Sequence, residues 1–170
     1  MHFRRAIAVA ICLAAFRPVT ATAGSEEHTL SIRPEYSYLE AHGAGLSLGY
    51  QWGIDDVFNL WVDGGWISIP SSSRTASSAI SHRFMASIGA SYHLDTFQWV
   101  PYLATSVGFY GALVRDGAFR PGLGLELGGG VDYRPMRRWS IGIFGMFHAI
   151  VVGEIPHHGT AGLRVNIYFR

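Results

Sequence analysis

The stretch Gly122–Tyr133, GLGLELGGGVDY, alternates between two kinds of residue. Leucines, then Val131 and Tyr133, occupy every second position, and glycines with two acids, Glu126 and Asp132, occupy the positions between them. A period of two is that of a β-strand, in which successive side chains point to opposite faces. The pattern therefore predicts a strand with one bulky apolar face and one face of glycine and carboxylate.

The same period recurs in seven other segments, which predicts eight strands in all. These segments are residues 29–38, 45–52, 58–66, 83–94, 99–111, 139–151 and 161–169, of which 99–111 alternates least cleanly. Most of them have the length of about 9–11 residues that a tilted strand needs to cross a bilayer.

The connections between the segments fall into two classes. Short turns are expected at 53–56, 95–98 and 134–138, and longer polar loops at 67–82, 113–120 and 153–160, while the first connection at 40–44 is short. Short turns at one end and longer loops at the other are typical of an outer-membrane barrel, whose longer loops face the outside.

The beginning of the chain has the features of a secretory signal peptide. A basic MHFRR is followed by a short apolar stretch and by ATA at 21–23, which predicts cleavage after Ala23 and a mature barrel domain of residues 24–170. The single cysteine, Cys12, would leave with the signal. The mature domain is then expected to contain no disulfide, thiolate nucleophile or cysteine metal site.

The composition suits an exported, apolar protein. Charged residues make up 15% of the chain, lysine is absent, and aromatic residues reach 14%, whereas charged residues make up about 25% of ordinary globular proteins. The net charge of +1 argues against a nucleic-acid partner. The mature segment has no run of about 18 apolar residues, so no transmembrane helix is expected.

Side-chain volume decides which face of the predicted barrel points inward. An eight-stranded barrel is just wide enough for its inward side chains or for one small ligand, so the bulky apolar face does not fit inside as it would in a soluble lipocalin- or avidin-like barrel. We therefore predict an all-β fold, an eight-stranded antiparallel up-and-down transmembrane β-barrel with the apolar face toward lipid.

Aromatic residues are sorted to the ends of the predicted strands. This distribution predicts two interfacial girdles, although aromatic residues also favour strands in general. The predicted girdle residues are Trp52, Trp66, Tyr92, Trp99, Tyr133, Trp139 and Phe169, with Trp66 near the loop end and the others near the short turns.

Charged residues at mid-height on the inner face predict a plug. Buried charges require pairing and hydrogen bonds, so we expect a network of two arginines and three carboxylates that fills the lumen. Its members are Arg33, Glu35, Asp63, Glu126 and Arg164, with the two arginines on the neighbouring first and last strands. The alternative is a continuous water pore.

The mature chain resembles the small eight-stranded outer-membrane barrels around OmpX, OmpW and the OmpA membrane domain. The resemblance is clearest in residues 92–111, YHLDTFQWVPYLATSVGFYG, with a tight turn, a W-x-PY motif and a strand of small residues. The terminal VNIYF at 165–169 is similar to the assembly signal of such barrels, although Arg170 follows it. The resemblance implies an outer-membrane location and recognition by the barrel-assembly machinery.

An enzymatic alternative is a lipid A deacylase, which is also an eight-stranded barrel with a His-x-Ser pair near the outer end of a late strand. The matching stretch here is FHAIVVGE, residues 147–154, in which Ile150 follows His148 at the serine position. Acyl transfer needs an activated oxygen or sulfur beside its base. We therefore expect no catalytic residues, and we expect His148 to be an interior histidine.

No cofactor or metal is predicted. Four histidines, His42, His82, His157 and His158, fall on or near the expected outer loops, but their spacing is not that of a metal site. Basic residues at both ends could contact anionic headgroups, including lipopolysaccharide phosphates, although ordinary interfacial anchoring is the preferred interpretation. They are Arg74, Arg115 and Arg120 on the loops and Arg134, Arg137 and Arg138 at a short turn.

These observations favour a non-enzymatic integral barrel of the outer membrane that serves as an envelope or surface-interaction protein. Its expected partners are outer-membrane lipid and lipopolysaccharide, while the sequence does not identify a partner of the outer loops. The alternatives are a lipid-modifying enzyme and a narrow channel or binder of small apolar molecules.

Overall fold

The structure is a computed structural model and describes residues 27–39, 42–70, 80–94 and 98–169. Its eight strands are β1 (His28–Leu39), β2 (Gly43–Gly53), β3 (Phe58–Ser68), β4 (Ile80–His93), β5 (Trp99–Val114), β6 (Phe119–Met136), β7 (Trp139–Gly153) and β8 (His158–Phe169). The predicted signal peptide, residues 1–23, lies outside the described residues. Among these residues, no helix is long and apolar enough to cross a membrane.

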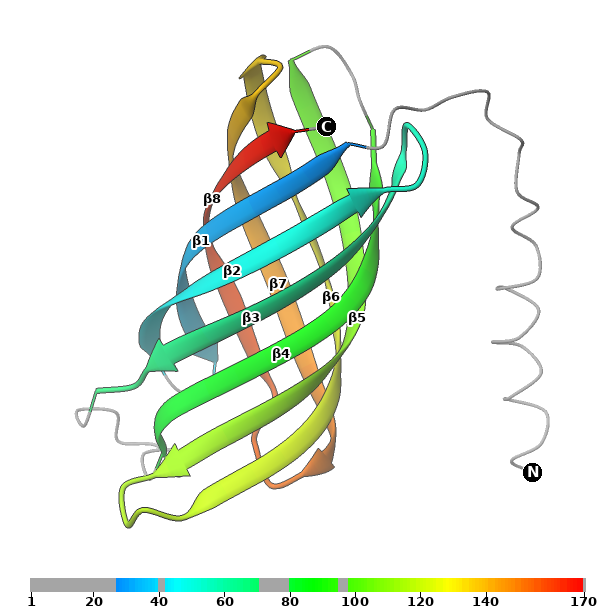
Figure 1. Cartoon of the computed structure of the whole chain (residues 1–170). Helices are drawn as coiled ribbons and strands as arrows, with labels where there is room; N and C mark the ends of the chain where they lie inside the picture. The colour runs from blue at the N-terminus through cyan, green and yellow to red at the C-terminus, as the bar shows by residue number, and fades with distance from the viewer. Residues whose placement is uncertain (1–26, 40–41, 71–79, 95–97, 170) are drawn as a thin grey trace, which may run out of the picture.

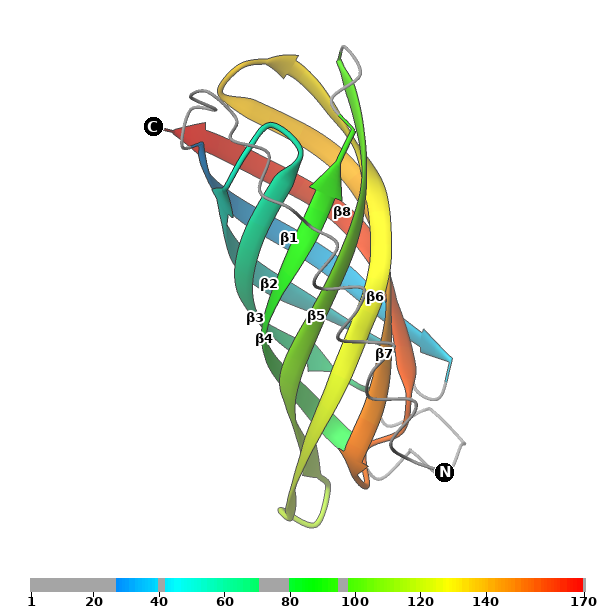
Figure 2. The ribbon, with the colours of Figure 1, turned by 90° about the vertical axis from the view of Figure 1, so that its right-hand side faces the viewer.

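The strands form one closed barrel (Figures 1 and 2). Each strand pairs antiparallel with its neighbours in sequence, and β1 also pairs antiparallel with β8, where His28 lies opposite Phe169. Closure leaves no unpaired edge. The predicted eight-stranded antiparallel up-and-down barrel is confirmed.

The strands are longer than the sequence predicted. The expected loops at 113–120 and 153–160 are shorter than predicted, because the flanking strands β5, β6, β7 and β8 extend into them. Most of the expected turn at 134–138 belongs to β6. Alternation is lost where polar residues occupy both faces, yet backbone pairing continues there because it does not depend on side-chain polarity. The prediction of long loops at these two connections was therefore wrong.

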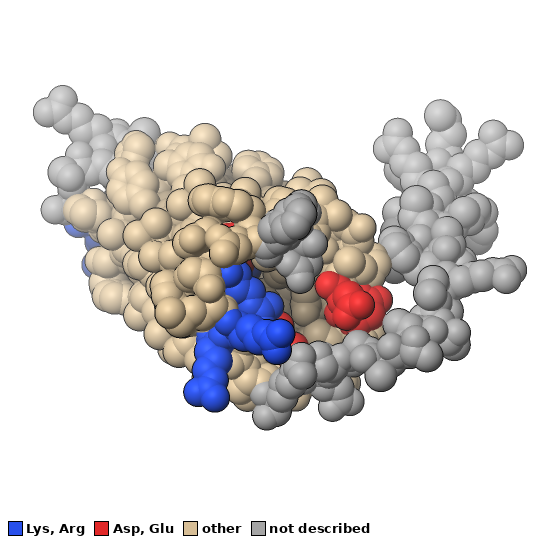
Figure 3. Space-filling view, turned by 90° about the horizontal axis from the view of Figure 1, so that it is seen from above, with Lys and Arg blue, Asp and Glu red and all other residues tan. Residues whose placement is uncertain are grey.

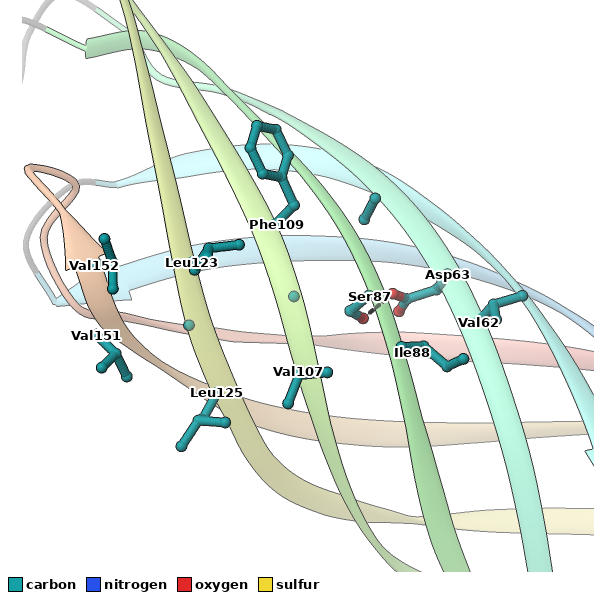
Figure 4. Close-up of a pocket in the computed structure, with 13 residues that line it drawn as sticks. Val62, Asp63, Ser87, Ile88, Val107, Phe109, Leu123, Leu125, Val151 and Val152 are labelled. Carbon is teal, nitrogen blue, oxygen red and sulfur yellow. Dashed lines mark hydrogen bonds between the residues drawn. The ribbon is translucent and has the colours of Figure 1, made fainter.

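The two faces of the barrel differ as the sequence predicted. The outward side chains are apolar and exposed, for example Leu103 at 68% and Leu127 at 66%, whereas the inward Glu126 is 1% exposed. Figure 4 shows this on one wall, where Val107 and Leu125 point away from the barrel and the hydrogen-bonded Asp63 and Ser87 lie inside. A groove of about 810 Å³ runs along this outer wall.

Inward apolar side chains form two clusters inside the barrel. We call the end with the short turns the turn end and the other end the loop end. The cluster in the turn half contains Trp61, Tyr102, Ala104, Phe144 and Met146. The cluster in the loop half contains Ile67, Ile69, Ile80, Met85, Tyr110, Ala112, Ile150 and Ile155.

The glycine-rich face of β6 makes room for these inward side chains. A Cβ at Gly130 would lie 2.7 Å from the hydroxyl oxygen of Tyr102 on the adjacent strand, and one at Gly128 would overlap Met146. Glycine is therefore the residue that lets bulky groups from neighbouring strands lie across β6, which explains the opening sequence pattern.

Candidate functional site

The lumen holds the five residues predicted as a charge network. Arg33, Glu35, Asp63, Glu126 and Arg164 are all buried and lie on inward positions of β1, β3, β6 and β8. Arg33 and Asp63 form one ion pair, Arg164 and Glu126 each belong to a group of their own, and Glu35 bonds to a serine.

Arg33 belongs to the group near mid-height. Its guanidinium forms an ion pair with Asp63, and its Cζ lies 5.8 Å from the ring centroid of Trp61 and 5.6 Å from that of Phe144. The hydroxyl of Ser87 donates to Asp63 and lies 3.4 Å from Oε2 of Glu126, so Ser87 links these two carboxylates.

Glu35 lies beside Arg33 on the same face of β1. Its Oε1 accepts a hydrogen bond of 2.5 Å from the hydroxyl of Ser47 on β2. This bond satisfies one carboxylate oxygen locally, across a single pair of adjacent strands.

Arg164 pairs with Asp132, an acid outside the predicted set. Nε of Arg164 donates to Oδ1 of Asp132 at 3.2 Å, and Nη2 donates to Oδ2. Asn166 donates to the same carboxylate at 2.9 Å. The guanidinium lies 3.9 Å from the ring centroid of Tyr102, so the lumen at this level is filled by a bidentate, charge-assisted pair under an aromatic ring.

Glu126 belongs to a third group, in the loop half of the lumen. Its Oε1 accepts a hydrogen bond of 2.7 Å from Tyr110 and lies 3.5 Å from Nδ1 of His148. Nε2 of His148 lies 3.0 Å from the hydroxyl of Thr160, and the His148 and His158 rings stack at 4.4 Å. The group therefore connects β5, β6, β7 and β8 through polar contacts.

The position of His148 bears on the deacylase alternative. His148 is 0% exposed and points into the barrel, and Ile150 on the same face is also buried. The Glu126–His148–Thr160 contacts have the order of an acid, a histidine and a hydroxyl, but all three side chains are buried between strands. This histidine has no contact with the lipid-facing side.

The sequence prediction omitted several lumen residues. They are Arg83, Asp132, Tyr110 and His158, together with the hydrogen-bonded Asn166. Asp132 and Arg83 occupy inward positions in the alternation, so that signal was present in the sequence. The stagger of the strands decides which inward charges lie at the same height in the lumen.

The seven predicted girdle residues lie on the outer wall near the strand ends. Trp99 and Tyr133 are opposite each other on β5 and β6, with ring centroids 4.9 Å apart. Tyr92 contacts Phe58 at 5.0 Å, and His28 stacks between Tyr50 and Phe169. Trp52, Trp66, Trp99, Trp139 and Phe169 are exposed on the outside.

The turn end of the barrel opens into a polar mouth of about 950 Å³. Basic and acidic side chains gather on opposite sides of this mouth (Figure 3). Arg134 donates two hydrogen bonds to Glu27, at 3.0 and 2.7 Å, and lies 3.8 Å from the ring centroid of Tyr168. The ion pair fastens the segment before β1 to β6.

The histidines near the loop end each have different partners. His42 contacts Tyr36, His82 stacks on Trp66, and His157 accepts a hydrogen bond from the Ile150 amide. His158 begins β8 and is fully buried, so its predicted loop position was wrong. No group of three His, Cys, Asp or Glu in the described ranges could hold a metal ion.

The arginines that could meet headgroup phosphates lie at both ends. Arg120 is 3.6 Å from Glu154 near the loop end, and Arg115 follows β5 at the same end. Arg137 and Arg138 form the exposed turn between β6 and β7. Arg74 lies outside the described residues.

No protein-family model matches the sequence, and no curated protein matches it significantly. Solved structures do match the fold. Neisserial surface protein A matches with a TM-score of 0.67 at 15% identity, covering 84% of this chain and 96% of that one. The N-terminal barrel of Pseudomonas aeruginosa OprF gives 0.60 at 18% identity, covering 83% and 97%. Ail of Yersinia pestis gives 0.58 at 14% identity, covering 85% and 99%. At these identities the likeness shows the fold, a closed barrel of the kind found in bacterial outer membranes.

Proposed function

We propose that this protein is a non-enzymatic integral barrel of the outer membrane that serves the envelope or the cell surface and carries no open pore. The observation that supports this most directly is the reversal of polarity between its faces. Charges are buried inside, as Glu126 is, while leucine, isoleucine and valine side chains cover the outside. Such an outer wall is stable against acyl chains and unfavourable in water.

The filled lumen supports the absence of a pore. In the turn half, Trp61, Tyr102 and Phe144 pack together with the two ion-paired arginines, Arg33 and Arg164. In the loop half, Tyr110 and His148 are fully buried under the isoleucine-rich cluster. An ion would have to displace these paired groups in order to cross.

The interior placement of His148 supports a non-enzymatic role. A lipid-modifying barrel has to present its nucleophile and base to the acyl chains, whereas His148 and Thr160 are buried in the lumen. Acyl-transfer chemistry also requires room for the substrate carbonyl beside the nucleophile.

The location is tested by fractionation and by gel migration. The protein should be found in the outer-membrane fraction, and its folded form should migrate differently from the boiled form in detergent electrophoresis. Recovery of a folded protein from the soluble fraction without detergent would overturn the proposal.

Two further measurements separate the proposal from its alternatives. Planar-bilayer recordings should show no steady conductance above the empty bilayer, and sustained open channels would favour the channel alternative. Mass spectrometry of lipid A, with and without expression, should give the same acyl pattern, and a lost acyl chain would favour the enzyme.

A further inference from the structure

Arg83 is a third arginine inside the barrel, on β4 in the loop half, and its environment differs from that of the other two. The residue is 1% exposed. Its Nη1 donates to the hydroxyl of Ser37, on the far side of the lumen on β1, at 3.2 Å. Its Nε and Nη2 are buried, and neither has a hydrogen-bond partner among the residues that the structure describes.

The two other inward arginines show what Arg83 lacks. Arg33 forms an ion pair with Asp63, and Arg164 forms one with Asp132. No ion pair joins Arg83 to a carboxylate in the described part of the chain. A buried guanidinium without a counter-charge is strongly unfavourable, so the contrast within one lumen points to a missing negative charge.

Glu126 is the carboxylate of the same half of the lumen, and it has other partners. Its Oε1 accepts from Tyr110 and lies near Nδ1 of His148, and its Oε2 lies near Ser87. Glu126 therefore contacts polar groups of β4, β5 and β7 and makes no hydrogen bond or ion pair with Arg83.

A second unpaired polar atom lies in the same cluster. Nε2 of His158 is buried without a hydrogen-bond partner in the described ranges, and the His158 and Tyr110 rings meet edge to face at 5.9 Å. Arg83 interacts electrostatically with both His158 and Tyr110. Around them are fully or almost fully buried groups, including Ala112 and Ile80, so a group bound here would be shielded from water.

We propose that the lumen binds a small monovalent anion, of the size of chloride or formate, on the free edge of Arg83. Nε and Nη2 lie on the same edge of the planar guanidinium, and their two N–H groups converge on one halide or on the two oxygens of a carboxylate. One guanidinium charge is balanced by one negative charge. Because the surrounding side chains are almost fully buried, we expect the site to admit only a small anion. The bound anion completes the link from β4 to β1 and stabilises the closed barrel.

A water molecule is the competing occupant. Nδ1 of His158 lies 3.3 Å from the carbonyl oxygen of Pro156, which can only accept, so Nε2 of the neutral ring is an acceptor. A water could accept from Arg83 and donate to this Nε2. It would leave the guanidinium charge without compensation, and for that reason we favour the anion.

The first test measures folding stability of the full mature chain in detergent micelles. Bromide or formate is titrated against gluconate at constant ionic strength, and the folded fraction in urea is followed by gel migration. We expect the folding equilibrium constant to rise as one plus the ratio of the anion concentration to its dissociation constant, which is about 100-fold at 100 times that constant. Comparison of the bromide titration with the formate titration shows whether the site prefers a halide or a carboxylate.

Two variants test whether the stabilisation by the anion arises at Arg83. Arg83→Met should lose the dependence on the anion, while Arg138→Met, which removes an exposed arginine at the other end, should keep it. Absence of any dependence on bromide or formate, or a dependence that is the same in Arg83→Met, would overturn the proposal.

A direct measurement needs no variant. Crystals of the wild-type barrel grown in bromide should show an anomalous difference peak in contact with Nε and Nη2 of Arg83. Formate-grown crystals should show planar density at the same edge if the carboxylate is preferred. Water density alone under both conditions would establish the competing occupant and overturn the anion site.

Discussion

Asp132 on β6 and Arg164 on β8 form a buried ion pair that passes over Gly142 of the intervening strand β7. The three residues lie side by side in the sheet, since Asp132 is registered with Gly142 and Gly142 with Arg164. A Cβ at Gly142 would overlap Oδ1 of Asp132 and the carbonyl oxygen of Val131. The ion pair therefore depends on glycine at this position of the central strand.

Substitution of Gly142 should break this pair. Gly142→Ala displaces the Asp132 carboxylate and leaves two buried charges poorly paired, so we expect a loss of about 3–5 kcal/mol in the free energy of unfolding. Urea unfolding in micelles measures it. Gly145→Ala is the control on the same strand, because its Cβ would meet only the Thr160 carbonyl oxygen at 4.0 Å. Equal effects of the two substitutions would contradict the role of Gly142.

Removal of one partner of this ion pair should destabilise the barrel mainly because the other charge stays buried without a counter-charge, and less because their attraction is lost. Arg164→Met leaves Asp132 buried without a counter-charge, although Asn166 still donates to it, and should destabilise the barrel by about 3–5 kcal/mol. The double variant Asp132→Leu/Arg164→Met should recover most of this loss, because neither charge then remains. A double-mutant cycle in urea gives the coupling. Additive losses would show that the two residues act independently.

A charge on the outer wall should be costly at mid-height and tolerated at a turn. Leu125→Arg places a cation among acyl chains and should cost about 2–4 kcal/mol in a bilayer. Ile54→Arg, in the turn between β2 and β3, should cost less than about 1 kcal/mol. Folding titrations in lipid vesicles measure both. A barrel with its apolar surface in water would tolerate the two substitutions equally.

Removal of inward rings should open the lumen. Trp61→Ala/Phe144→Ala deletes two rings of the turn-half cluster that lie beside Arg33. We expect measurable conductance in planar bilayers where the wild type shows none. The matched control is Trp66→Ala/Phe147→Ala, which removes two exposed rings from the outer wall. A silent inner variant, or equal conductance of the inner and control variants, would show that the turn-half cluster alone does not close the lumen.

The alternation of residues in the sequence predicted much of the fold. It placed Glu126 and Asp132 on the inner face and Leu123 and Leu125 on the outer face, because strand side chains alternate whatever the strand's neighbours. It did not locate the strand ends, as at 113–120, where side-chain polarity changes but backbone pairing continues.

The sequence by itself determined the number of strands, the face on which each side chain lies and the position of the aromatic residues near the strand ends. These features follow from local period and volume. Only the tertiary structure decided that Arg164 pairs with Asp132, that Glu126 bonds to Tyr110, and that Arg83 forms no ion pair with a carboxylate of the described residues. Partners across the lumen are fixed by the stagger at which the sheet closes, and this stagger is a property of the whole barrel that no single strand encodes.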